Sequence, residues 1–599
     1  MTESNYWSRF GGTVSRRTIL RGGAVGVAGL AGAALIGCGD TKKDAAPAGT
    51  AAAGTPTAVA SNQTAKKGGT LRVSGQLTGD VPSLDYDRSN SSALGSITNL
   101  TGVKLTQWDE RPDSPGPVEN VIPDLAASWE SPDQGTTWTF KLKKGVKTSD
   151  GLEVKAEDVI WSLNRGAGGI RAPQGLVQSN MPDIYSARTG KAEVNAKAID
   201  EYTLQFKLAK PDADFLSMMG SHWWSVEHKD VITKKGTDQG KTAPGWGDII
   251  GVDQIRGGGP YYPSEYVPAS GFKMKRNPNF YDSNLAYLDG IDHPFILDPA
   301  AASAALVAGQ LDAHGPLTQF TVQQGIELQK SPNLQVDWQP CMVWNPWEFD
   351  HTREPFNDVR VRRALALAVD RPGWIKNLLQ GRGRNGVMVL PWLTYWAMDP
   401  AKMGDDGKYF TGFDQAEAKK LLLAAGKEKF TYTLQNSNIG AYTVTYPFAD
   451  LMASQLAQVG ITQKQVIIDY AAHLTKWAPE VDGGIREGFI VRPDIQSYAF
   501  AQVGMGSPLS AGKEIWGALT KNDKEYQDFR VIAEKQAVTL DRNARKELIN
   551  DMQKRMARNV WDFYWPAPDS PVVSSKKVHN FRPPPGWNWN IMKYVWKDA

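Results

Sequence analysis

The chain contains few residues in patterns that could perform catalysis or hold a metal ion. Its seven histidines are scattered along the sequence: His222, His228, His293, His314, His351, His473 and His579. His222 and His228 lack the spacing that places two imidazoles on one face of a zinc-binding helix. No G-x-S-x-G nucleophile elbow occurs, and Cys341 has no surrounding motif that would mark it as a nucleophile. We therefore predict no catalytic residue, no metal site and no cofactor.

Aromatic side chains suit binding better than catalysis, and the chain is rich in tryptophan. It has 21 tryptophans in 599 residues, which is about twice or more what an average composition would give. Large aromatic side chains dominate the energetics of burial, so we expect most of these indoles in cores. Indole faces also stack on the C–H surfaces of sugars and on cations, so the remaining tryptophans favour a binding surface.

Length and charge narrow the class of protein. With 22% charged and 41% hydrophobic residues, the chain is long enough for several globular domains. Its 67 basic and 64 acidic residues give a net charge of +3, which offers no electrostatic footprint for nucleic acid. The two cysteines, Cys38 and Cys341, lie far apart, and the role assigned to Cys38 below leaves no disulfide pair. Stability must then come from large hydrophobic cores.

The N-terminal residues have the features of an export signal. Arg16 and Arg17 form a twin-arginine sequence, and an uncharged Gly/Ala-rich run, 22–37, leads to Cys38. This resembles a Tat signal joined to a lipobox, in which Cys38 becomes the lipid-modified N-terminus of the mature protein. A transmembrane anchor is the alternative, but a run of about 16 residues with many glycines is too short and too weakly apolar for a stable span. Two or more acyl chains on Cys38 would give lasting attachment to the membrane.

The segment that follows the signal, 39–69, is predicted to be a flexible tether. Between 41 and 67 it contains Ala, Thr, Gly, Pro and Lys with almost no large apolar residue. Such a composition cannot bury enough surface to offset the entropy lost on ordering. We expect the folded part to start near Gly69.

The most informative stretch of the folded part is 124–165. Its pattern predicts a strand, a turn at Asp133 and Gly135, and a second strand that places alternate residues of 138–142 on one face. Apolar residues at helical spacing follow between 156 and 163, so the hairpin should lead into a helix.

Further helices are predicted from their caps and apolar spacing. They are 299–308 with Asp298 as N-cap, 359–368 capped by Asn357 or Asp358, 415–425 opened by a capping box at Asp414–Glu417, and a helix that places Leu451, Met452, Leu456 and Val459 on its buried face. The run 466–468, Val-Ile-Ile, is predicted to be a buried strand. Helices that alternate with short apolar strands argue for α/β lobes.

Several of these segments together resemble family 5 extracellular solute-binding proteins, the receptors that deliver peptides, nickel or oligosaccharides to ABC importers. The resemblance rests on the 124–165 string and on four further segments: Pro82–Asp85, Gly257–Tyr261, Phe272–Tyr281 and Pro355–Arg371. A glycine cluster such as 257–259 can also cradle a phosphate, but no Lys-Ser or Lys-Thr follows it and Pro260 would block the helix that a cradle needs. The resemblance covers essentially Gly69 to the C-terminus.

The resemblance implies an α/β, two-lobed periplasmic-binding-protein-like fold with an extra inserted subdomain. One lobe would consist of 70–105, 200–325 and 570–599, with the inserted subdomain at 106–199, and the other lobe would span 326–569. The sequence departs from the family pattern at Lys155, where the family commonly has a Thr suited to capping the helix, so we expect this helix to start less firmly. We expect a monomer.

The resemblance also implies that ligand lies between the lobes, where loops of the second lobe supply contacts. The candidate ligand-binding residues are Trp344, Asn345, Trp392, Tyr395, Trp396, Gly488, Phe489, Arg492 and Asp494. In peptide-binding members a strand near Arg492 ends in an aspartate that pairs with the terminal amine of the peptide. If Arg492 faces the cleft, it favours a carboxylate, phosphate or polyhydroxylated ligand, whereas a shift of two residues lets Asp494 restore peptide binding.

These observations predict a lipid-anchored extracytoplasmic solute-binding protein that passes a polar solute, either peptide or oligosaccharide, to the permease of an ABC importer. Nickel is disfavoured because the only histidines near the proposed contacts are His351, His473 and His222. A Tat-exported enzyme is the alternative from another class, and it would need a cofactor motif that the sequence lacks. A stand-alone scavenging or sensory receptor is a third possibility.

Overall fold

The computed structural model divides the chain into two compact units, Met1–Thr57 and Ala58–Ala599. It describes residues 64–75, 84–85, 92–112, 114, 120–167, 194–221, 224–235, 249, 251–315, 320–340, 346–389, 393–437, 445–468, 484–487, 523–583 and 589–599, all within the second unit. The predicted signal with Arg16, Arg17 and Cys38 lies outside these ranges. In the described part, no helix combines the length and the apolar character that a membrane crossing needs.

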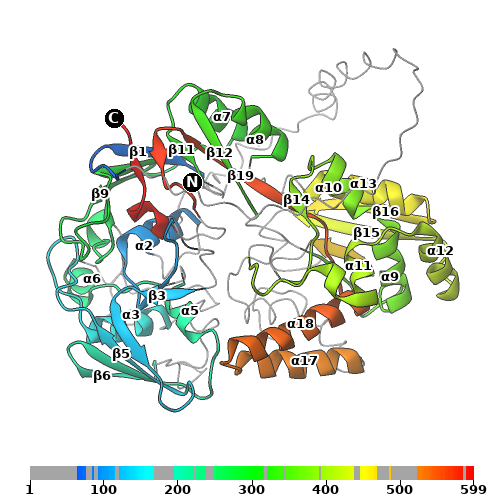
Figure 1. Cartoon of the computed structure of the whole chain (residues 1–599), viewed down its shortest axis with the longest axis horizontal. Helices are drawn as coiled ribbons and strands as arrows, with labels where there is room; N and C mark the ends of the chain where they lie inside the picture. Colours follow the sequence, from blue (N-terminus) through cyan, green and yellow to red (C-terminus); the bar gives the residue numbers. More distant parts are fainter. Residues whose placement is uncertain are drawn as a thin grey trace, which may run out of the picture. The chain divides into compact units, whose positions relative to one another are not determined.

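An eight-stranded sheet gathers segments from both ends of the chain (Figure 1). Its strands run in the order β12 (Leu334–Pro340), β19 (Ala567–Ser575), β11 (Ala313–His314), β1 (Thr70–Ser74), β10 (Gly290–Pro294), β9 (Gly271–Arg276) and β8 (Tyr261–Val267), and β14 (Gly383–Arg384) pairs with β19. The central strand β1 is parallel to both β10 and β11. Leu71, Val73 and Ile291 face a core that also takes up Trp589 and Met592 near the C-terminus. The two ends of the folded unit are thus joined in one core.

Short helices surround this sheet. They are α2 (Ser92–Thr101), α6 (Lys229–Lys235), α7 (Pro299–Val307) and α8 (Val322–Gln329), with 3-10 helices η3 (Val252–Gln254) and η8 (Asn590–Lys593) and a small β20 (Val578–His579) and β21 (Trp596–Lys597) pair. Helices α7 and α8 form a second apolar layer with Val573 of β19.

A four-stranded antiparallel sheet contains the stretch that the sequence marks most clearly. Its order is β4 (Ala126–Glu130), β5 (Thr137–Leu142), β7 (Thr203–Lys207) and β6 (Ala196–Asp200). The turn between β4 and β5 is held by Asp133, whose Oδ1 accepts hydrogen bonds from the backbone N–H of Thr136 (3.2 Å) and Thr137 (2.6 Å). Gly135 adopts φ = +95°, a left-handed conformation that glycine takes without steric cost. The predicted hairpin is confirmed.

The four-stranded sheet is covered by short helices and flanked by a hairpin. The helices are α3 (Ala156–Ala167) and α5 (Phe215–Met219), and the hairpin is β2 (Thr106–Trp108) with β3 (Val121–Pro123). Phe140, Phe206 and Phe215 meet edge to face in the shared core. The eight-stranded and four-stranded sheets with their helices are called the first lobe below.

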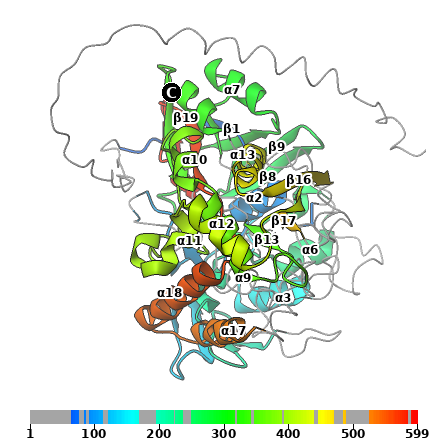
Figure 2. The same ribbon diagram turned by 90° about the vertical axis from the view of Figure 1, so that its right-hand side faces the viewer.

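The second lobe is built on a five-stranded sheet. Its order is β16 (Ile461–Ile468), β15 (Phe430–Ser437), β17 (Ile485–Glu487), β13 (Trp347–Phe349) and β18 (Asp562–Phe563). Its helices are α9 (Val359–Ala368), α10 (Arg371–Asn377), α11 (Lys408–Thr411), α12 (Gln415–Ala424), α13 (Thr445–Ala457), α17 (Lys524–Ala537) and α18 (Arg542–Asn559), with η4 (Pro400–Lys402) and η5 (Gly404–Gly407). In both views α17 and α18 lie side by side (Figures 1 and 2).

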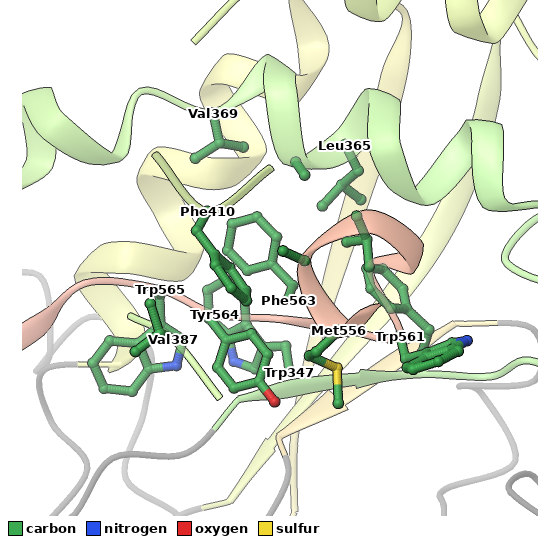
Figure 3. Packing of buried hydrophobic residues seen from close by; sticks show 14 of the residues in the cluster. Trp347, Leu365, Val369, Val387, Phe410, Met556, Trp561, Phe563, Tyr564 and Trp565 are labelled. Carbon is green, nitrogen blue, oxygen red and sulfur yellow. The ribbon is translucent and has the colours of Figure 1, made fainter. Parts of the chain in front are cut away.

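Aromatic side chains fill the core of the second lobe. Trp347 of β13 stacks on Phe563 of β18 with ring centroids 5.6 Å apart. Figure 3 shows this pair packed with Trp565 and with Leu365 of α9. Among the described tryptophans, nine are buried: Trp108, Trp224, Trp347, Trp374, Trp396, Trp561, Trp565, Trp589 and Trp596. For this part of the chain, the expectation that most indoles lie in cores is confirmed.

The predicted helix starts are confirmed by their caps. The side chain of Asp298 accepts a hydrogen bond from Ala301 N (2.7 Å) at the start of α7, and Asp358 accepts one from Arg360 N (2.8 Å) at α9. Asp414 accepts one from Glu417 N (2.9 Å) at α12, but the structure does not show the return hydrogen bond from Asp414 N to the Glu417 side chain, so the predicted capping box is only half formed. These signals are local, since each cap acts within three residues of its helix start.

The glycine cluster at 257–259 is a close-packing site. A Cβ at Gly257 would lie 2.1 Å from the carbonyl oxygen of Thr101, and one at Gly259 would lie 2.6 Å from that of Leu100. Only glycine therefore lets this backbone approach the C-terminal end of α2.

Three expectations differ from the structure. The run 466–468 is not a buried strand: β16 is an edge strand and Ile467 is 53% exposed. Leu451 of α13 is also exposed rather than on its buried face. We expected the inserted subdomain to end at 199, but β7 follows that position and still belongs to the four-stranded sheet. We expected the first lobe to end at 325 until its last segment, but β12 follows that position and still belongs to the eight-stranded sheet. A strand joins the sheet of its long-range partner, and local sequence does not reveal that partner.

Candidate functional site

Of the candidate contacts, the structure describes Tyr395 and Trp396. The others, Trp344, Asn345, Trp392, Gly488, Phe489, Arg492 and Asp494, lie outside the described residues. Tyr395 and Trp396 are neighbours in a loop and their rings meet at a right angle with centroids 4.8 Å apart. Trp396 is only 8% exposed and Tyr395 is half-buried.

Helix α18 holds both aromatic residues from one side. The Tyr395 hydroxyl donates to Asn543 Oδ1 at 2.9 Å. Arg542 Cζ lies 3.9 Å and Lys546 Nζ 4.1 Å from the centroid of the Tyr395 ring. Such cation–π contacts are favourable by about 0.5–1 kcal/mol each at exposed sites. The side chains of Arg542 and Lys546 therefore cover the Tyr395 ring, so the ring is not an open surface on which a ligand could stack.

The loop is also fixed through its backbone. Gln553 of α18 donates from Nε2 to the Trp396 carbonyl oxygen (3.0 Å) and accepts at Oε1 from Met398 N (2.9 Å). The buried amide of Gln553 thus satisfies two backbone groups of the loop and fixes the loop against α18.

A buried ion pair joins α18 to the first lobe. Arg545 donates from Nη1 and Nη2 to the two carboxylate oxygens of Asp214, at 2.7 and 2.8 Å. Both side chains are nearly fully buried. Arg545 also donates to Gln536 Oε1 (2.9 Å) and lies over the Trp396 ring at 5.5 Å. This pair places Trp396 where the two lobes meet.

Sequence reasoning did not identify this ion pair. Asp214 precedes α5 and looks like an N-cap, yet its side chain makes no capping hydrogen bond because Arg545 engages both oxygens. Beside it, Ala213 N donates to the Ala537 carbonyl oxygen at 2.8 Å. No local signal connects residues that are 331 positions apart.

Two arginines of the 355–371 segment have structural roles. Arg362 donates to the carbonyl oxygens of Phe356, Asn559 and Val560, and Arg371 donates to those of Ala366 and Tyr409. Burial lowers the pKa of Arg362 to about 10 and that of Arg371 to about 9. These guanidinium groups hold buried backbone of the second lobe together and do not form part of the candidate contacts.

The described histidines offer no metal site. Within the described ranges, no group of three or more His, Cys, Asp or Glu side chains is arranged to hold a metal ion. His351, one of the histidines considered for nickel, is buried and its Nε2 lies 2.7 Å from the Trp561 carbonyl oxygen. Burial lowers the pKa of His293 to about 3 and that of His314 to about 4. Both are neutral core residues of the first lobe.

A surface hollow of about 580 Å³ is lined mainly by residues of β1, β8, β9 and β10. Its lining alternates in charge, with Lys273, Arg276, Asp289 and Asp292 among its residues. Of the two candidate contacts that the structure describes, neither Tyr395 nor Trp396 lines it.

Comparison with known proteins decides the family. Residues 120–485 match the family described as bacterial extracellular solute-binding proteins, family 5 Middle. The chain belongs to this family. The match covers more than half of the 599 residues and includes the 124–165 stretch, so the resemblance seen in the sequence is confirmed.

Curated relatives of this family 5 protein share modest identity with it. The dipeptide-binding protein of Escherichia coli (strain K12) is 26% identical over 379 residues, which make up 59% of this chain and 65% of the relative. The chain thus spans less than two thirds of that relative's length. The glutathione-binding protein GsiB of Salmonella choleraesuis is 24% identical over 469 residues, 77% of this chain and 81% of the relative.

Solved structures share its fold. The oligopeptide-binding protein AppA from Bacillus subtilis, in complex with a nonapeptide, gives a TM-score of 0.65 at 20% identity and covers 90% of this chain and 100% of its own. DppA from Helicobacter pylori, in complex with the peptide STSA, gives 0.68 at 20% identity and covers 89% of this chain and 99% of its own. The expected two-lobed α/β periplasmic-binding-protein fold is confirmed.

Proposed function

We propose that this family 5 protein is the solute-binding subunit of an ABC importer and captures a short peptide or related polar solute between its lobes. The observation that carries the proposal is the family match over 120–485. The named relatives bind dipeptides or glutathione, and the AppA and DppA structures contain peptides. In such a receptor the open form binds solute, closure of the lobes traps it, and the closed form meets the permease.

The described aromatic candidates favour a peptide over an oligosaccharide. Sugar recognition needs open aromatic faces, whereas Tyr395 is covered by Arg542 and Lys546 and Trp396 is almost fully buried. Among the candidates outside the described residues, Arg492 suits a carboxylate and Asp494 suits an ammonium group, the two ends of a peptide. Trp344, Asn345 and Trp392 remain proposed contacts from the same lobe.

We place the protein outside the cytoplasm, attached to the membrane by lipid on Cys38 after Tat export through Arg16 and Arg17. The support is the twin-arginine sequence and the lipobox-like ending of the signal. Cys38→Ser should release the exported protein from membranes, whereas Arg16→Lys with Arg17→Lys should retain it in the cytoplasm. Cell fractionation followed by immunoblotting distinguishes these outcomes.

The proposed function is tested by titrating the purified protein, without its signal, with di- and tripeptides and with oligosaccharides of two to four units. Tryptophan fluorescence reports closure and calorimetry gives affinity. We expect saturable binding of at least one peptide. If both classes leave fluorescence and heat unchanged, the proposed function is wrong.

A further inference from the structure

The chain enters the first lobe through a short arm, 64–69, that leads directly into the central strand β1. The arm has no regular secondary structure and most of its residues are exposed. The composition of 39–69 predicts a flexible tether that includes this arm. An exposed segment of this kind is ordered only where specific contacts hold it, so its partners decide whether it belongs to the tether or to the folded unit.

Both glycines of the arm are bonded to the loop between β9 and β10. Gly68 N donates to the Tyr287 carbonyl oxygen at 2.8 Å. Gly69 N donates to Asp289 Oδ2 at 2.9 Å, and the Gly69 carbonyl oxygen accepts from Asp289 N at 2.8 Å. Gly68 has φ = +118° and Gly69 has φ = +77°, which are conformations that other residues adopt only with strain. The path of the arm therefore requires two consecutive glycines.

The two lysines of the arm are held by different segments. Lys67 Nζ donates to the Ser283 carbonyl oxygen at 2.6 Å. Lys66 Nζ donates to Asp598 Oδ1 at 2.5 Å and lies 5.9 Å from the centroid of the Trp596 ring. The Lys66 and Asp598 side chains stay partly exposed, so their ion pair alone contributes little. It acts together with the backbone hydrogen bonds of the glycines.

Asp598 is positioned from its other side by β20. His579 Nε2 lies 2.9 Å from Asp598 Oδ2, and Asp598 N donates to the Lys577 carbonyl oxygen at 2.9 Å. The His579 ring stacks on Trp596 with centroids 3.9 Å apart and 16° between the planes. The hydrogen bonds with Lys66 and His579 hold the pKa of Asp598 below its usual range. One carboxylate therefore joins the arm to β20.

The same C-terminal segment also contacts the start of β1. Lys597 Nζ donates to the Thr70 carbonyl oxygen at 3.2 Å and to Asp312 Oδ2 at 2.9 Å. Asp312 Oδ2 also accepts from Arg72 N at 2.8 Å. Since β1 lies between β10 and β11 in the eight-stranded sheet, movement of the chain before β1 would act on a central strand unless the arm is held.

We propose that residues 596–598 and the loop 283–289 form a clasp, which fixes the arm to the first lobe and isolates β1 from movement of the chain that precedes the arm. The chain then leaves the folded unit before Lys66, beside β21. This inference goes beyond solute capture. Its value for a lipid-attached protein rests on the proposed anchoring at Cys38, because movement of the tether would then end at the clasp.

Trypsin and hydrogen exchange test the clasp in the purified protein without its signal. Lys66 and Lys67 are themselves tryptic sites, and Lys42 and Lys43 of the predicted tether provide a comparison in the same chain. Asp598→Asn removes the charge that holds Lys66 and changes no residue near the cleaved bonds.

Two further variants complete the set. Gly68→Ala strains the bend of the arm. The control is Glu130→Gln, which changes an exposed glutamate of β4.

We expect cleavage after Lys66 and Lys67 to be at least about 10-fold slower than after Lys42 and Lys43, because it requires local opening of the arm. Asp598→Asn should accelerate it about 2- to 5-fold, the range for an exposed ion pair.

Hydrogen exchange should respond in the same direction. Gly68→Ala should speed exchange of the Gly69 amide about 5- to 30-fold, the range for a left-handed conformation without glycine. In both variants exchange of β1 should also rise, whereas α9 of the second lobe should exchange as in the wild type. Glu130→Gln should match the wild type throughout.

Equal cleavage rates at the two pairs of lysines in the wild type would overturn the clasp without recourse to any variant. Wild-type cleavage and exchange in both folded variants would overturn it as well, and unchanged exchange of β1 after loosening of the arm would overturn the isolation of β1. Circular dichroism identifies a variant that fails to fold. Neither measurement involves solute, so failure of the proposed function leaves the clasp standing and failure of the clasp leaves the proposed function standing.

Discussion

Asp562 of β18 and Glu348 of β13 form a pair of buried carboxyl groups directly opposite each other in the five-stranded sheet. Paired residues of neighbouring strands share a face, so the two acidic side chains are cross-strand neighbours. Burial and then the charge of Glu348 raise the pKa of Asp562 well above its ordinary value. The Tyr564 hydroxyl lies 3.4 Å from Asp562 Oδ2, a weak contact. The folded protein thus favours the neutral form of Asp562 more than water does.

Asp562→Asn should stabilise the protein more at pH 8 than at pH 5. The folded wild type keeps a proton on Asp562 that the unfolded chain releases above about pH 4, so wild-type stability falls as pH rises toward the folded-state pKa. Asparagine does not titrate, so the free energy of unfolding of the variant should not show this decrease. The decrease in the wild type amounts to about 1.4 kcal/mol for each unit of pKa shift. Urea unfolding at both pH values measures the difference, with exposed Asp405→Asn as control. A stability gain that does not change with pH would contradict the assignment.

At the scale of single elements, α3 shows how a helix begins without a good N-cap side chain. Lys155 precedes the helix, and its backbone N–H donates to Asp158 Oδ2 at 2.9 Å. Its side chain pairs with Glu201 at the surface, where both groups are largely exposed and such a pair contributes little. Only one of the two hydrogen bonds of a capping box is therefore present. The Asp158 side chain accepts from Lys155 N, but the Lys155 side chain has no acceptor for a backbone N–H of the first turn.

Lys155→Thr should raise the free energy of unfolding by about 0.5–1 kcal/mol, because the hydroxyl supplies the missing acceptor for the first turn of α3. Lys155→Ala is the matched control, since it removes the contact with Glu201 without adding a cap. We expect urea unfolding to give the order threonine, wild type, alanine, with the last two close together. Equal stability of the threonine and alanine variants would show that the cap does not form.

The elements also show what sequence can predict. The turn at Asp133 and the caps at Asp298, Asp358 and Asp414 were predictable because the donor and acceptor lie within four residues. The burial of β16 was not, because an apolar run reads the same in an edge strand as in a central one. The placement of β7 and β12 depends on partners elsewhere in the chain, such as β19 for β12.

At the scale of the whole folded unit, residues at lobe contacts come from distant parts of the sequence. The family resemblance proposed Tyr395 and Trp396 as ligand contacts, and this stays a prediction, whereas their partners on α18 had no signal in the sequence. Asp214 and Arg545 belong to no motif in the sequence. Such groups become visible only when burial and hydrogen-bond partners are known.

The Asp214–Arg545 pair gives a prediction about the equilibrium between open and closed lobes. A receptor that opens to admit solute must separate contacts that join its lobes, and this pair is bidentate, nearly fully buried and supported by Gln536. Asp214→Ala leaves the Arg545 cation buried without its carboxylate, which costs about 3–5 kcal/mol where the site stays dry. Opening hydrates the cation, so the cost falls on the closed form. The variant should therefore populate open conformations and bind the proposed solute more weakly.

Small-angle scattering and calorimetry together measure this shift. For ligand-free Asp214→Ala we expect a larger radius of gyration than for the wild type, and an affinity loss expressed mainly as faster solute release. The double variant Asp214→Leu with Arg545→Met keeps the contact apolar and removes the stranded cation, so it should recover much of the closed population. Asp528→Asn controls for loss of a partly exposed acidic residue that pairs with Lys524 on α17, outside the lobe contact. A single variant with wild-type dimensions and affinity would mean that the pair joins parts of the protein that never separate during solute binding.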